Sequence, residues 1–384
     1  MDILLEIIAL LILAKILGEL LEQVGIPSMI GEIGAGAILG PAVLGWVVMN
    51  PTLELFSEIG VIALLFISGA EMNISTFSKS KGVALSTAVS GVAIPFIFGT
   101  ALGTYFGYSL YEVLFLAITL SITSIGISVR TLIDQKQLNT PVGTTVVSAA
   151  VVDDIIGIFL LALLSSIAVA GSDGTGGIMY SVVGGLIFLV VFLTLGRRLI
   201  DWIFVTVRRS ETHEMVYSTA LILALVSAYI AHNMGLHYTI GAFLAGLILG
   251  GEIRKDRPLM DSLMDFGFGF FVTLFFASVG LLFTISLEAF FSPLILPLIL
   301  LAFGGKILGG FLGSVKFLNP REALSVGFGL CPRGEIALII AKISLAAGII
   351  TGELYSSVTV MVIITILATP FLMKAGFSYG SSKS

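Results

Sequence analysis

Two adjacent aspartates, Asp153 and Asp154, lie in the middle of an apolar run that extends from Val142 to Val169. About 20 apolar residues are enough to cross a bilayer as a helix, so this run is long enough to span a membrane. One acid at mid-membrane costs at least about 2.5 kcal/mol on insertion scales, and two neighbouring acids resist joint ionisation. The pair therefore needs a fold that shields it from lipid, and it is the first candidate for a functional site.

The composition places this run in a chain that is apolar throughout. Of 384 residues, 57% are hydrophobic and 11% are charged, and the mean hydropathy is +1.11. Soluble domains are usually about 25% charged, so these values predict an all-α integral membrane protein without a separate soluble domain. Cys331 is the single cysteine and the three histidines are scattered, which excludes an internal disulfide and argues against a resident metal site.

Apolar runs separated by polar residues, glycine or proline predict thirteen spans. Their approximate limits are 3–21, 28–47, 56–72, 83–105, 112–133, 142–169, 178–200, 214–231, 237–250, 259–284, 292–316, 321–348 and 354–376. Thirteen spans divide into a first repeat at 1–170, a linker helix and cytoplasmic loop at 177–210, and a second repeat at 213–377. Because the linker between the two repeats of six spans crosses the membrane once, the second repeat is inverted relative to the first.

The basic residues predict the orientation of the spans. With the N-terminus outside, the inner loops and the C-terminus hold 15 of the 19 basic residues, and the outer loops hold none. The fifteen are Lys79, Lys81, Arg130, Lys136, Arg197, Arg198, Arg208, Arg209, Arg254, Lys255, Arg257, Lys316, Arg321, Lys374 and Lys383. By the positive-inside rule this asymmetry favours an external N-terminus and a cytoplasmic C-terminus.

The fifth span of each half is interrupted near its middle by glycine, serine, threonine or proline. The interruptions lie at 119–126 and 327–335. Broken helices at equivalent places in two repeats indicate an ion site near the middle of the membrane. Non-helical backbone is tolerated inside a membrane only where protein or a water-filled cavity satisfies its hydrogen bonds.

Lys306 is the predicted partner of the acidic pair. It lies in the middle of the eleventh span, and the glycines around it allow another helix to approach closely. Asp153 and Asp154 point about 100° apart on a helix, so one can face a partner while the other faces a cavity. Burial favours the protonated form of a carboxyl group, so such an acid can hold either a proton or a small cation. The alternative is a buried ion pair that only fixes helix packing.

The residues at the two interruptions have two interpretations each. Thr123 and Ser124 supply hydroxyl and carbonyl oxygens to a hard cation, or they bond back to their own helical turn. Arg333 and Glu335 pair with each other or cap the broken helix ends, which we favour over direct contact with an ion.

The remaining charges within spans are assigned separately. Glu71 is either an interfacial acid near Lys79 and Lys81 or part of a path to the ion site. Lys15 and Glu19 are four residues apart and are predicted to pair on one helix. Lys342 is predicted to be buried, and to snorkel or to pair with an unidentified acid.

Several stretches together resemble the monovalent cation:proton antiporters, specifically sodium/proton exchangers of the NapA type and their Kef relatives. These are Gly25-Ile26-Pro27, Gly31, Gly36-Ala37-Ile38-Leu39-Gly40-Pro41, Phe66-Ile67-Ser68-Gly69-Ala70-Glu71-Met72, Val151-Val152-Asp153-Asp154, Phe275-Phe276-Ala277-Ser278-Val279-Gly280, Lys306 and Pro332-Arg333-Gly334-Glu335. The likeness extends from the second span to the twelfth.

The resemblance implies a core domain with two crossed discontinuous helices and a panel domain that forms a homodimer. It implies that Asp154 is the main ion and proton carboxylate and that Asp153 pairs with Lys306. It also implies electrogenic exchange of sodium or lithium for protons in the plasma membrane. We expect no cofactor, no enzymatic activity and no nucleic-acid partner; the partners are small cations and the lipid bilayer.

Three other functions fit the sequence less well. A potassium/proton antiporter of the Kef type is the main alternative, although no nucleotide-binding regulatory domain follows the last span. A membrane-embedded aspartyl protease needs two carboxylates facing one water, and adjacent residues of one helix diverge. A passive channel does not need a closely spaced titratable pair.

Overall fold

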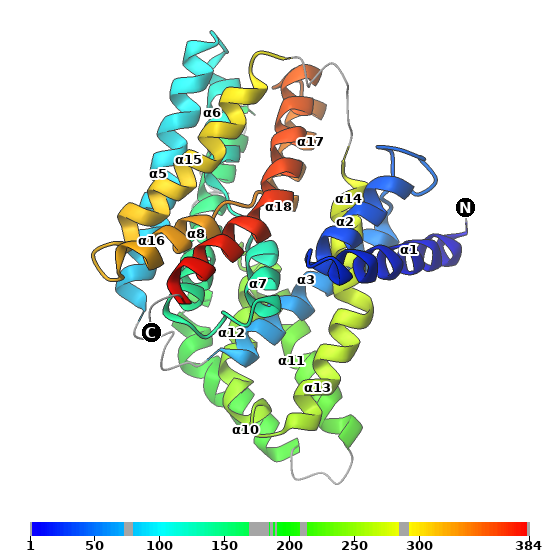
Figure 1. Ribbon diagram of the computed structural model, residues 1–384. Helices are drawn as coiled ribbons and strands as arrows, with labels where there is room; N and C mark the ends of the chain where they lie inside the picture. The colour runs from blue at the N-terminus through cyan, green and yellow to red at the C-terminus, as the bar shows by residue number, and fades with distance from the viewer. Residues whose placement is uncertain are drawn as a thin grey trace. The chain divides into compact units, whose positions relative to one another are not determined.

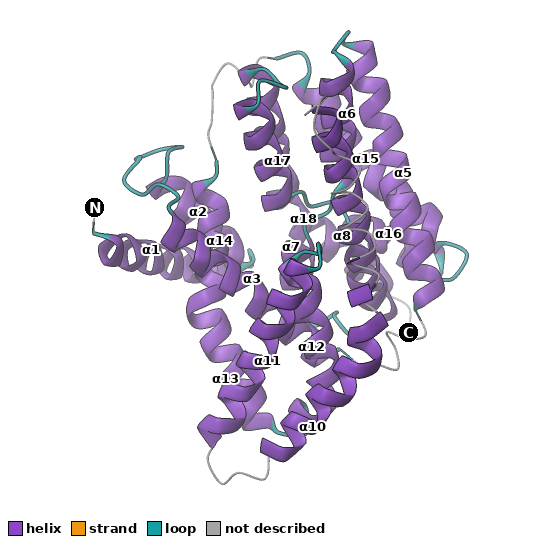
Figure 2. Cartoon of the chain, turned by 180° about the vertical axis from the view of Figure 1, so that it is seen from behind, coloured by secondary structure: helices purple, strands orange, loops and turns teal. Residues whose placement is uncertain are grey.

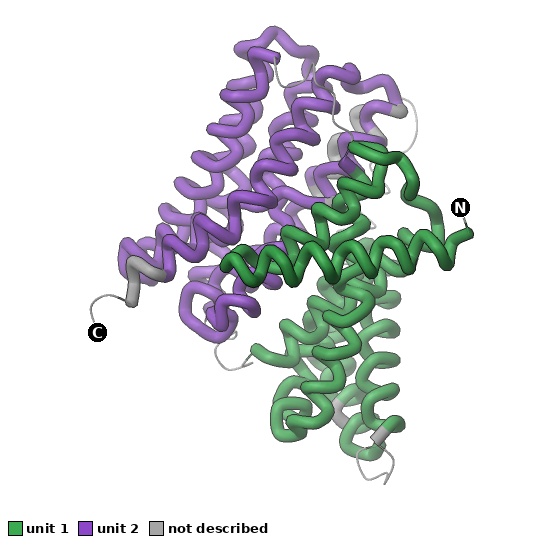
Figure 3. The backbone as a smooth tube through the Cα atoms, turned by 45° about the vertical axis from the view of Figure 1, so that its right-hand side comes forward, with its two compact units in different colours: residues 1–78, 179–282 green, residues 79–178, 283–384 purple. Residues whose placement is uncertain are grey.

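The computed structural model describes residues 2–72, 80–168, 184, 187–188, 190–207, 213–283 and 292–381. These residues form helices and loops, and no strand occurs among them (Figure 2). They group into two compact units: unit 1 comprises residues 1–78 and 179–282, and unit 2 comprises 79–178 and 283–384 (Figure 3). Each unit therefore combines a segment from the first half of the chain with a segment from the second half.

Unit 1 begins with three helices, as Figure 1 shows: α1 (Ile3–Gln23), α2 (Ser28–Leu39) and α3 (Pro51–Glu71). Its later segment contains a π-helix (Phe192–Gly196), α10 (Arg197–Val207), α11 (His213–Asn233) and α12 (Tyr238–Ile253). The unit ends with α13 (Arg257–Phe266), the π-helix η2 (Gly267–Phe271) and α14 (Val272–Leu281), which follow one another directly.

Unit 2 has the same arrangement of helices in its two segments. The first consists of α5 (Lys81–Tyr105), α6 (Leu110–Ser121), α7 (Ile125–Asp134) and α8 (Pro141–Ala168). The second consists of α15 (Ile295–Ser314), α16 (Pro320–Gly329), α17 (Glu335–Ala346) and α18 (Gly352–Ser381). In both segments a short pair of helices stands between two longer ones.

The predicted spans correspond to these helices, apart from 178–200, which lies partly outside the described residues. Seven described helices are long and apolar enough to cross a membrane, and α2 and α12 are shorter apolar helices. The second span was wrong at its end: α2 stops at Leu39 and not near residue 47. Pro41 forces Gly40 into an extended conformation, and the chain then turns through Gly45 at a φ of +62°. The predicted span 178–200 also ended too early, because α10 continues to Val207.

Glycines set the close packing within unit 1. Gly31 and Gly36 of α2, with Gly40 directly after the helix, recur with the same spacing as Gly241, Gly246 and Gly250 of α12. A side chain at Gly36 would collide with the backbone of α14 at Ala277 and Gly280, and one at Gly246 would collide with α3 at Phe66 and Ala70. The two halves of the unit therefore pack in the same way, with α2 on α14 and α12 on α3.

The equivalence extends to single contacts. A Cβ atom at Gly69 of α3 would meet the Phe243 carbonyl and the Leu247 amide of α12. A Cβ atom at Gly280 of α14 would meet the Ile33 carbonyl and the Ala37 amide of α2, which are the equivalent positions when α2 is aligned with α12 by its glycines. Exchange of the two halves thus maps the unit onto itself, as a twofold relation between two repeats requires. The boundaries of the repeats at 170, 177–210 and 213 remain predictions.

Glycines also bring α15 against α5 in unit 2. A Cβ atom at Gly305 would lie 3.1 Å from Pro95 Cα, and one at Gly309 would lie 2.7 Å from the Ser90 carbonyl oxygen. Ser90 Oγ donates a hydrogen bond to the Gly309 carbonyl at 2.7 Å. This close approach holds the neighbouring Lys306 in the interior of the unit, where it is 1% exposed.

The predicted pair between Lys15 and Glu19 was wrong. Lys15 Nζ lies 3.3 Å from Glu32 Oε1 on α2 and donates to the Phe268 carbonyl at 2.9 Å, while Glu19 accepts from the Gln23 amide at 2.9 Å. The i,i+4 rule applies to an isolated helix, whereas here the buried Glu32 offers a carboxylate that is shielded from competing water.

Replacement of Gly36 by valine tests this packing. We expect Gly36→Val to destabilise the protein by about 1–3 kcal/mol, as overpacking of a filled core does. The matched change on the same helix is Gly34→Val, because a Cβ atom at Gly34 meets nothing within 4 Å. Thermal unfolding of the detergent-purified protein measures both; equal melting temperatures for the two variants would contradict the packing described here.

Candidate functional site

The first interrupted helix is divided by three residues. α6 ends at Ser121, α7 begins at Ile125, and Ile122 and Ser124 have extended backbone angles. The interruption falls within the predicted stretch 119–126. It frees the amide of Thr123 and neighbouring backbone groups from helical hydrogen bonds, so they need partners from elsewhere.

The second interrupted helix has a longer gap. α16 ends at Gly329, α17 begins at Glu335, and the residues between them include Pro332, which cannot donate a backbone hydrogen bond. This gap lies within the predicted stretch 327–335. The described structure therefore contains both predicted interruptions.

The two interruptions contact each other within unit 2. The Ser124 amide donates to the Pro332 carbonyl at 2.8 Å, and Ser128 Oγ donates to the Gly329 carbonyl at 2.6 Å. A side chain at Gly334 would collide with the Ser124 side chain, which explains the glycine there. Each gap thus satisfies part of the backbone that the other gap leaves free, as a membrane interior requires.

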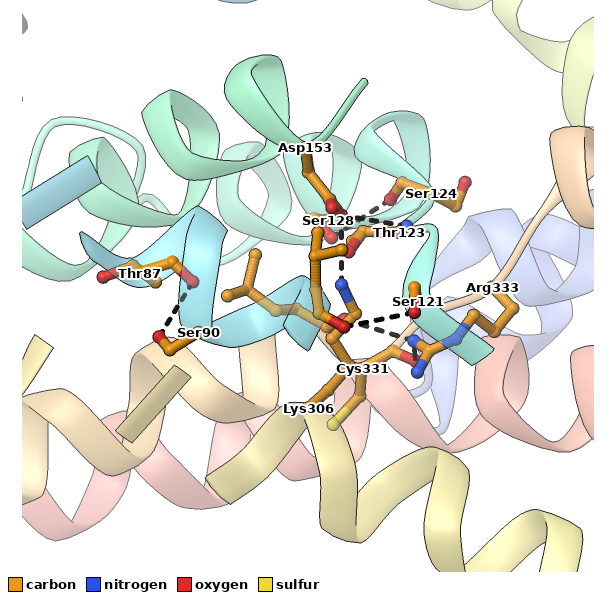
Figure 4. Close-up of polar contacts among 12 residues, drawn as sticks. Thr87, Ser90, Ser121, Thr123, Ser124, Ser128, Asp153, Lys306, Cys331 and Arg333 are labelled. Carbon is orange, nitrogen blue, oxygen red and sulfur yellow. Dashed lines mark hydrogen bonds and ion pairs between the residues drawn. The ribbon is translucent and has the colours of Figure 1, made fainter. Parts of the chain in front are cut away.

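Asp153 of α8 joins this crossing to Lys306 of α15. Lys306 Nζ donates to Asp153 Oδ2 at 3.0 Å, and the Thr123 amide donates to the same oxygen at 3.1 Å (Figure 4). Asp153 is 3% exposed and Lys306 is 1% exposed, so the ion pair is removed from bulk solvent. The partnership predicted from the sequence is present, and the free amide of the first interruption completes it.

Two further oxygens at this place are buried without a hydrogen-bond partner in the described part of the chain. They are Asp153 Oδ1 and Thr123 Oγ1. A buried polar atom without a partner costs about 1–3 kcal/mol, so such atoms require an explanation. Carboxylate and hydroxyl oxygens are also the ligands that hard cations prefer.

Asp154 follows Asp153 on α8 and is also buried, at 4% exposure. The two side chains point about 100° apart around the helix. Ser124, at the first interruption, is buried at 3% exposure. The site therefore holds two buried acids next to the crossing, and Lys306 neutralises the first of them.

Arg333 binds carbonyl groups at the second interruption. Its guanidinium donates to the Cys331 carbonyl at 2.6 Å and to the Ala302 carbonyl of α15 at 3.1 Å, and its amide donates to Thr365 Oγ1 at 3.2 Å. A cation at the carbonyl end of α16 is favoured by the helix dipole. Arg333 therefore binds carbonyl groups in and beside the second interruption; the side chain of Glu335 lies outside the described part of the structure, so a pair between the two residues stays a prediction.

Two other predicted residues are Glu71, in unit 1, and Lys342, in unit 2. Glu71 ends α3 in unit 1, where it interacts electrostatically with Arg254. Arg254 in turn donates to the Ala70 and Met72 carbonyls. Lys342 was predicted to be buried and is exposed on α17, where its long stem can carry the charge to the membrane surface.

The sequence analysis missed Glu32 and Thr365. Glu32 is 2% exposed in α2, and it could have been found as an acid within an apolar run. Thr365 has no such signal, because a threonine in a membrane helix usually bonds to its own turn.

Two interrupted helices that contact each other beside a buried acid–lysine pair are typical of secondary ion transporters. The comparison with protein families agrees: a family model described as sodium/hydrogen exchanger, transmembrane, matches residues 7–374. The chain belongs to the sodium/hydrogen exchanger family, and it is a multi-pass membrane protein.

Individual relatives match over nearly the whole chain. The probable Na(+)/H(+) antiporter GerT of Bacillus cereus is 32% identical over 97% of this chain and 98% of its own length. The Na(+)/H(+)-K(+) antiporter GerN of the same organism is 30% identical over 97% of this chain and 95% of its own length. The solved structure of the sodium proton antiporter MjNhaP1 from Methanocaldococcus jannaschii is 18% identical, with 100% of both chains covered. Its TM-score of 0.74 shows that the two proteins share a fold.

A double-mutant cycle tests the buried ion pair. We expect Asp153→Asn and Lys306→Met each to destabilise the protein by about 3–5 kcal/mol, because each leaves the other charge buried and unpaired. The double variant should lose less free energy of unfolding than the two single variants lose together. Thermal or denaturant unfolding of the four proteins measures the coupling; strictly additive losses would show that the two groups do not interact.

Proposed function

We propose that the protein is a secondary antiporter that exchanges sodium, or lithium, for protons across the plasma membrane. The observation that carries this proposal is the Asp153–Lys306 ion pair at the contact of two interrupted helices, directly beside the buried Asp154. Membership of a family of transporters supports a transport function and not an enzymatic one.

Competition at Asp154 is the proposed coupling mechanism. A buried carboxyl group binds a sodium ion only when it is deprotonated, so proton and cation exclude each other at one place. Thr123 Oγ1 and Asp153 Oδ1 lack hydrogen-bond partners in the described structure, so we assign them as further ligands. Ser124 completes the proposed set with its oxygens. The mechanism needs no cofactor.

Lys306 and Asp153 set the electrostatics of the exchange in this proposal. Lys306 cancels the charge of Asp153, so the net charge of the site depends on what Asp154 holds. Two adjacent acids with a lysine resemble the electrogenic branch of these antiporters, in which more protons than cations move in each cycle. Arg333 supports the site by holding the carbonyl end of the second interruption.

Alternating access would move unit 2 against unit 1. All described polar contacts of the site lie within unit 2, which can therefore move as a body without breaking them. Unit 1 then serves as the panel that makes a homodimer. Its α1 exposes an apolar stripe formed by Leu4, Ile8, Ile12, Ile16 and Leu20. The basic inner loops support an external N-terminus and a cytoplasmic C-terminus.

Sodium exchange is favoured over potassium exchange of the Kef type. The family model, GerT and GerN are named for sodium, although the name of GerN includes potassium as well. Flux measured in proteoliposomes with sodium, lithium and potassium in parallel, across a range of pH, distinguishes the two cations.

The first functional prediction concerns Asp154. We expect Asp154→Asn to abolish sodium-driven proton flux in proteoliposomes under an imposed pH gradient, because the amide cannot exchange a proton for a cation. Glu19→Gln is the matched control, since Glu19 is an exposed acid of unit 1 whose described hydrogen bond, from the Gln23 side-chain amide, stays within α1. Normal flux in Asp154→Asn would rule out the proposed mechanism.

The second concerns Lys306. We expect Lys306→Gln to retain sodium-dependent flux but to change its pH profile or the charge moved per cycle, since glutamine can bond to Asp153 without neutralising it. Flux and membrane potential recorded with pH- and voltage-sensitive dyes report both quantities. If neither quantity changes, Lys306 has a structural role only.

A further inference from the structure

Unit 1 contains a buried polar cluster of its own, which the proposed transport site in unit 2 does not use. Glu32 of α2 is 2% exposed, and its Oε1 atom lies 3.3 Å from Lys15 Nζ of α1 and 3.0 Å from Thr273 Oγ1 of α14. Lys15 Nζ also donates to Thr273 Oγ1 and, at 2.9 Å, to the Phe268 carbonyl of η2. The cluster therefore joins α1 and α2 to the π-helix that stands between α13 and α14.

The hydrogen bonds of this cluster depend on the π winding of η2. The Thr273 hydroxyl lies 2.8 Å from the Phe268 carbonyl oxygen, which is five residues before it. A threonine hydroxyl in an ordinary α-helix of this chain, such as that of Thr131, bonds to the carbonyl four residues before. If η2 were α-helical, Gly269 would take that place and the Phe268 carbonyl would turn by about 100°, away from Lys15 and Thr273. The full set of bonds thus forms only in the π register.

The other half of unit 1 provides a comparison within the same molecule. α1 and α11 have 21 residues each and begin 210 residues apart. The glycines that follow them, Gly25 and Gly235, have φ angles of +78° and +83°, and the packing glycines Gly36 and Gly246 keep the same separation. Each position of α1 and α2 therefore corresponds to the position 210 residues later.

The counterparts of the three side chains in the cluster are all apolar. For α3 and α14 the separation is 211 residues, because Gly69 and Gly280 are equivalent packing points. The matched residues are Leu225 for Lys15, Ala242 for Glu32 and Ile62 for Thr273. The helix that contains Ile62, α3, is α-helical from Pro51 to Glu71. The π-helix thus coincides with the polar cluster, and the packing of the unit does not itself require either.

α13 can bury an apolar face in either of two registers. Leu259 and Leu263 are its buried residues, and Met260 and Met264 follow them directly and are partly buried. A π-turn holds one more residue than an α-turn, so its conversion to α would move the residues of α13 by one helical position, about 100° and 1.5 Å. The two methionines would then occupy the places of the two leucines.

α13 is the segment that turns in such a conversion, because α14 is held in place. Gly36 of α2 contacts the α14 backbone at Ala277 and Gly280 so closely that no Cβ atom fits between them. α13 has only Leu259 and Leu263 as buried residues. A change of register therefore costs little packing on the side of α13 and a great deal on the side of α14.

We propose that Lys15, Glu32 and Thr273 form a latch that sets the register of α13. With the latch closed, η2 stays a π-helix and α13 buries its two leucines. When Lys15 leaves the cluster, η2 becomes α-helical and α13 turns to bury its two methionines. The Lys15 side chain is 47% exposed, so this arm of the latch can leave while Glu32 remains buried. The latch lies in unit 1 and does not rest on the proposed transport function.

The labelling rates of single thiols on α13 report its register. Leu263→Cys and Met264→Cys are introduced separately into the full-length chain, and their reaction with a small water-soluble maleimide is followed in the detergent-purified protein; Cys331 is buried. We expect Thr273→Val to speed the labelling of Leu263→Cys about tenfold or more, the effect of one hydrogen bond to a charged group. The same change should slow the labelling of Met264→Cys, because residue 264 enters the buried place that residue 263 leaves.

Further variants serve as controls. Lys15→Met removes the ammonium and should act as Thr273→Val does, so the test stands if one of the two does not fold. Thr273→Ser keeps the hydroxyl and should preserve the original rates. Thr219→Val is the matched change, because the Thr219 hydroxyl bonds to the Met215 carbonyl four residues before it in α11. Ser262→Cys marks a position that is exposed in both registers, and it should label rapidly throughout.

Other outcomes would overturn the proposal. If neither Thr273→Val nor Lys15→Met changes the labelling of Leu263→Cys, the cluster does not set the register. Faster labelling of both Leu263→Cys and Met264→Cys would show that α13 unfolds locally and does not turn. An equal effect of Thr219→Val would show a general loss of stability and would likewise contradict a latch.

Discussion

The cost of burying charge in an apolar interior governs how unit 2 is built. Asp153 cannot stay ionised there without compensation, and two groups supply it: the Lys306 ammonium and the amide of Thr123. That amide is free only because the helix is interrupted at residues 122–124. The interruption, the ion pair and the contact with the second interruption therefore depend on one another, and loss of any one leaves a polar group without a partner.

Close helix packing makes this arrangement possible. The glycines of α15 let it approach α5 so closely that Lys306 lies inside the unit and not in lipid. Unit 1 uses the same device in α2 and α12, where Gly36 and Gly246 occupy equivalent contacts.

The sequence predicted the spans and the central ion pair well, for a clear physical reason. Charges within apolar runs are costly and therefore rare, so Asp153, Asp154 and Lys306 stood out without any structure. Predictions that depended on contacts between helices succeeded less often. Lys15 pairs with Glu32 of another helix and not with Glu19, because hydrophobic periodicity does not specify which helices are neighbours. The end of α2 was misplaced because apolar residues continue beyond the turn at Pro41 and Gly45.

The central claim is that one buried carboxyl group holds either a proton or a sodium ion. Infrared difference spectroscopy of the purified protein, recorded at fixed pH before and after sodium is added, observes this exchange directly. The account predicts that sodium removes the absorption of a protonated carboxyl group and releases a proton, and that Asp154→Asn shows neither change. A carboxyl absorption that sodium leaves unaltered at every pH would contradict the claim.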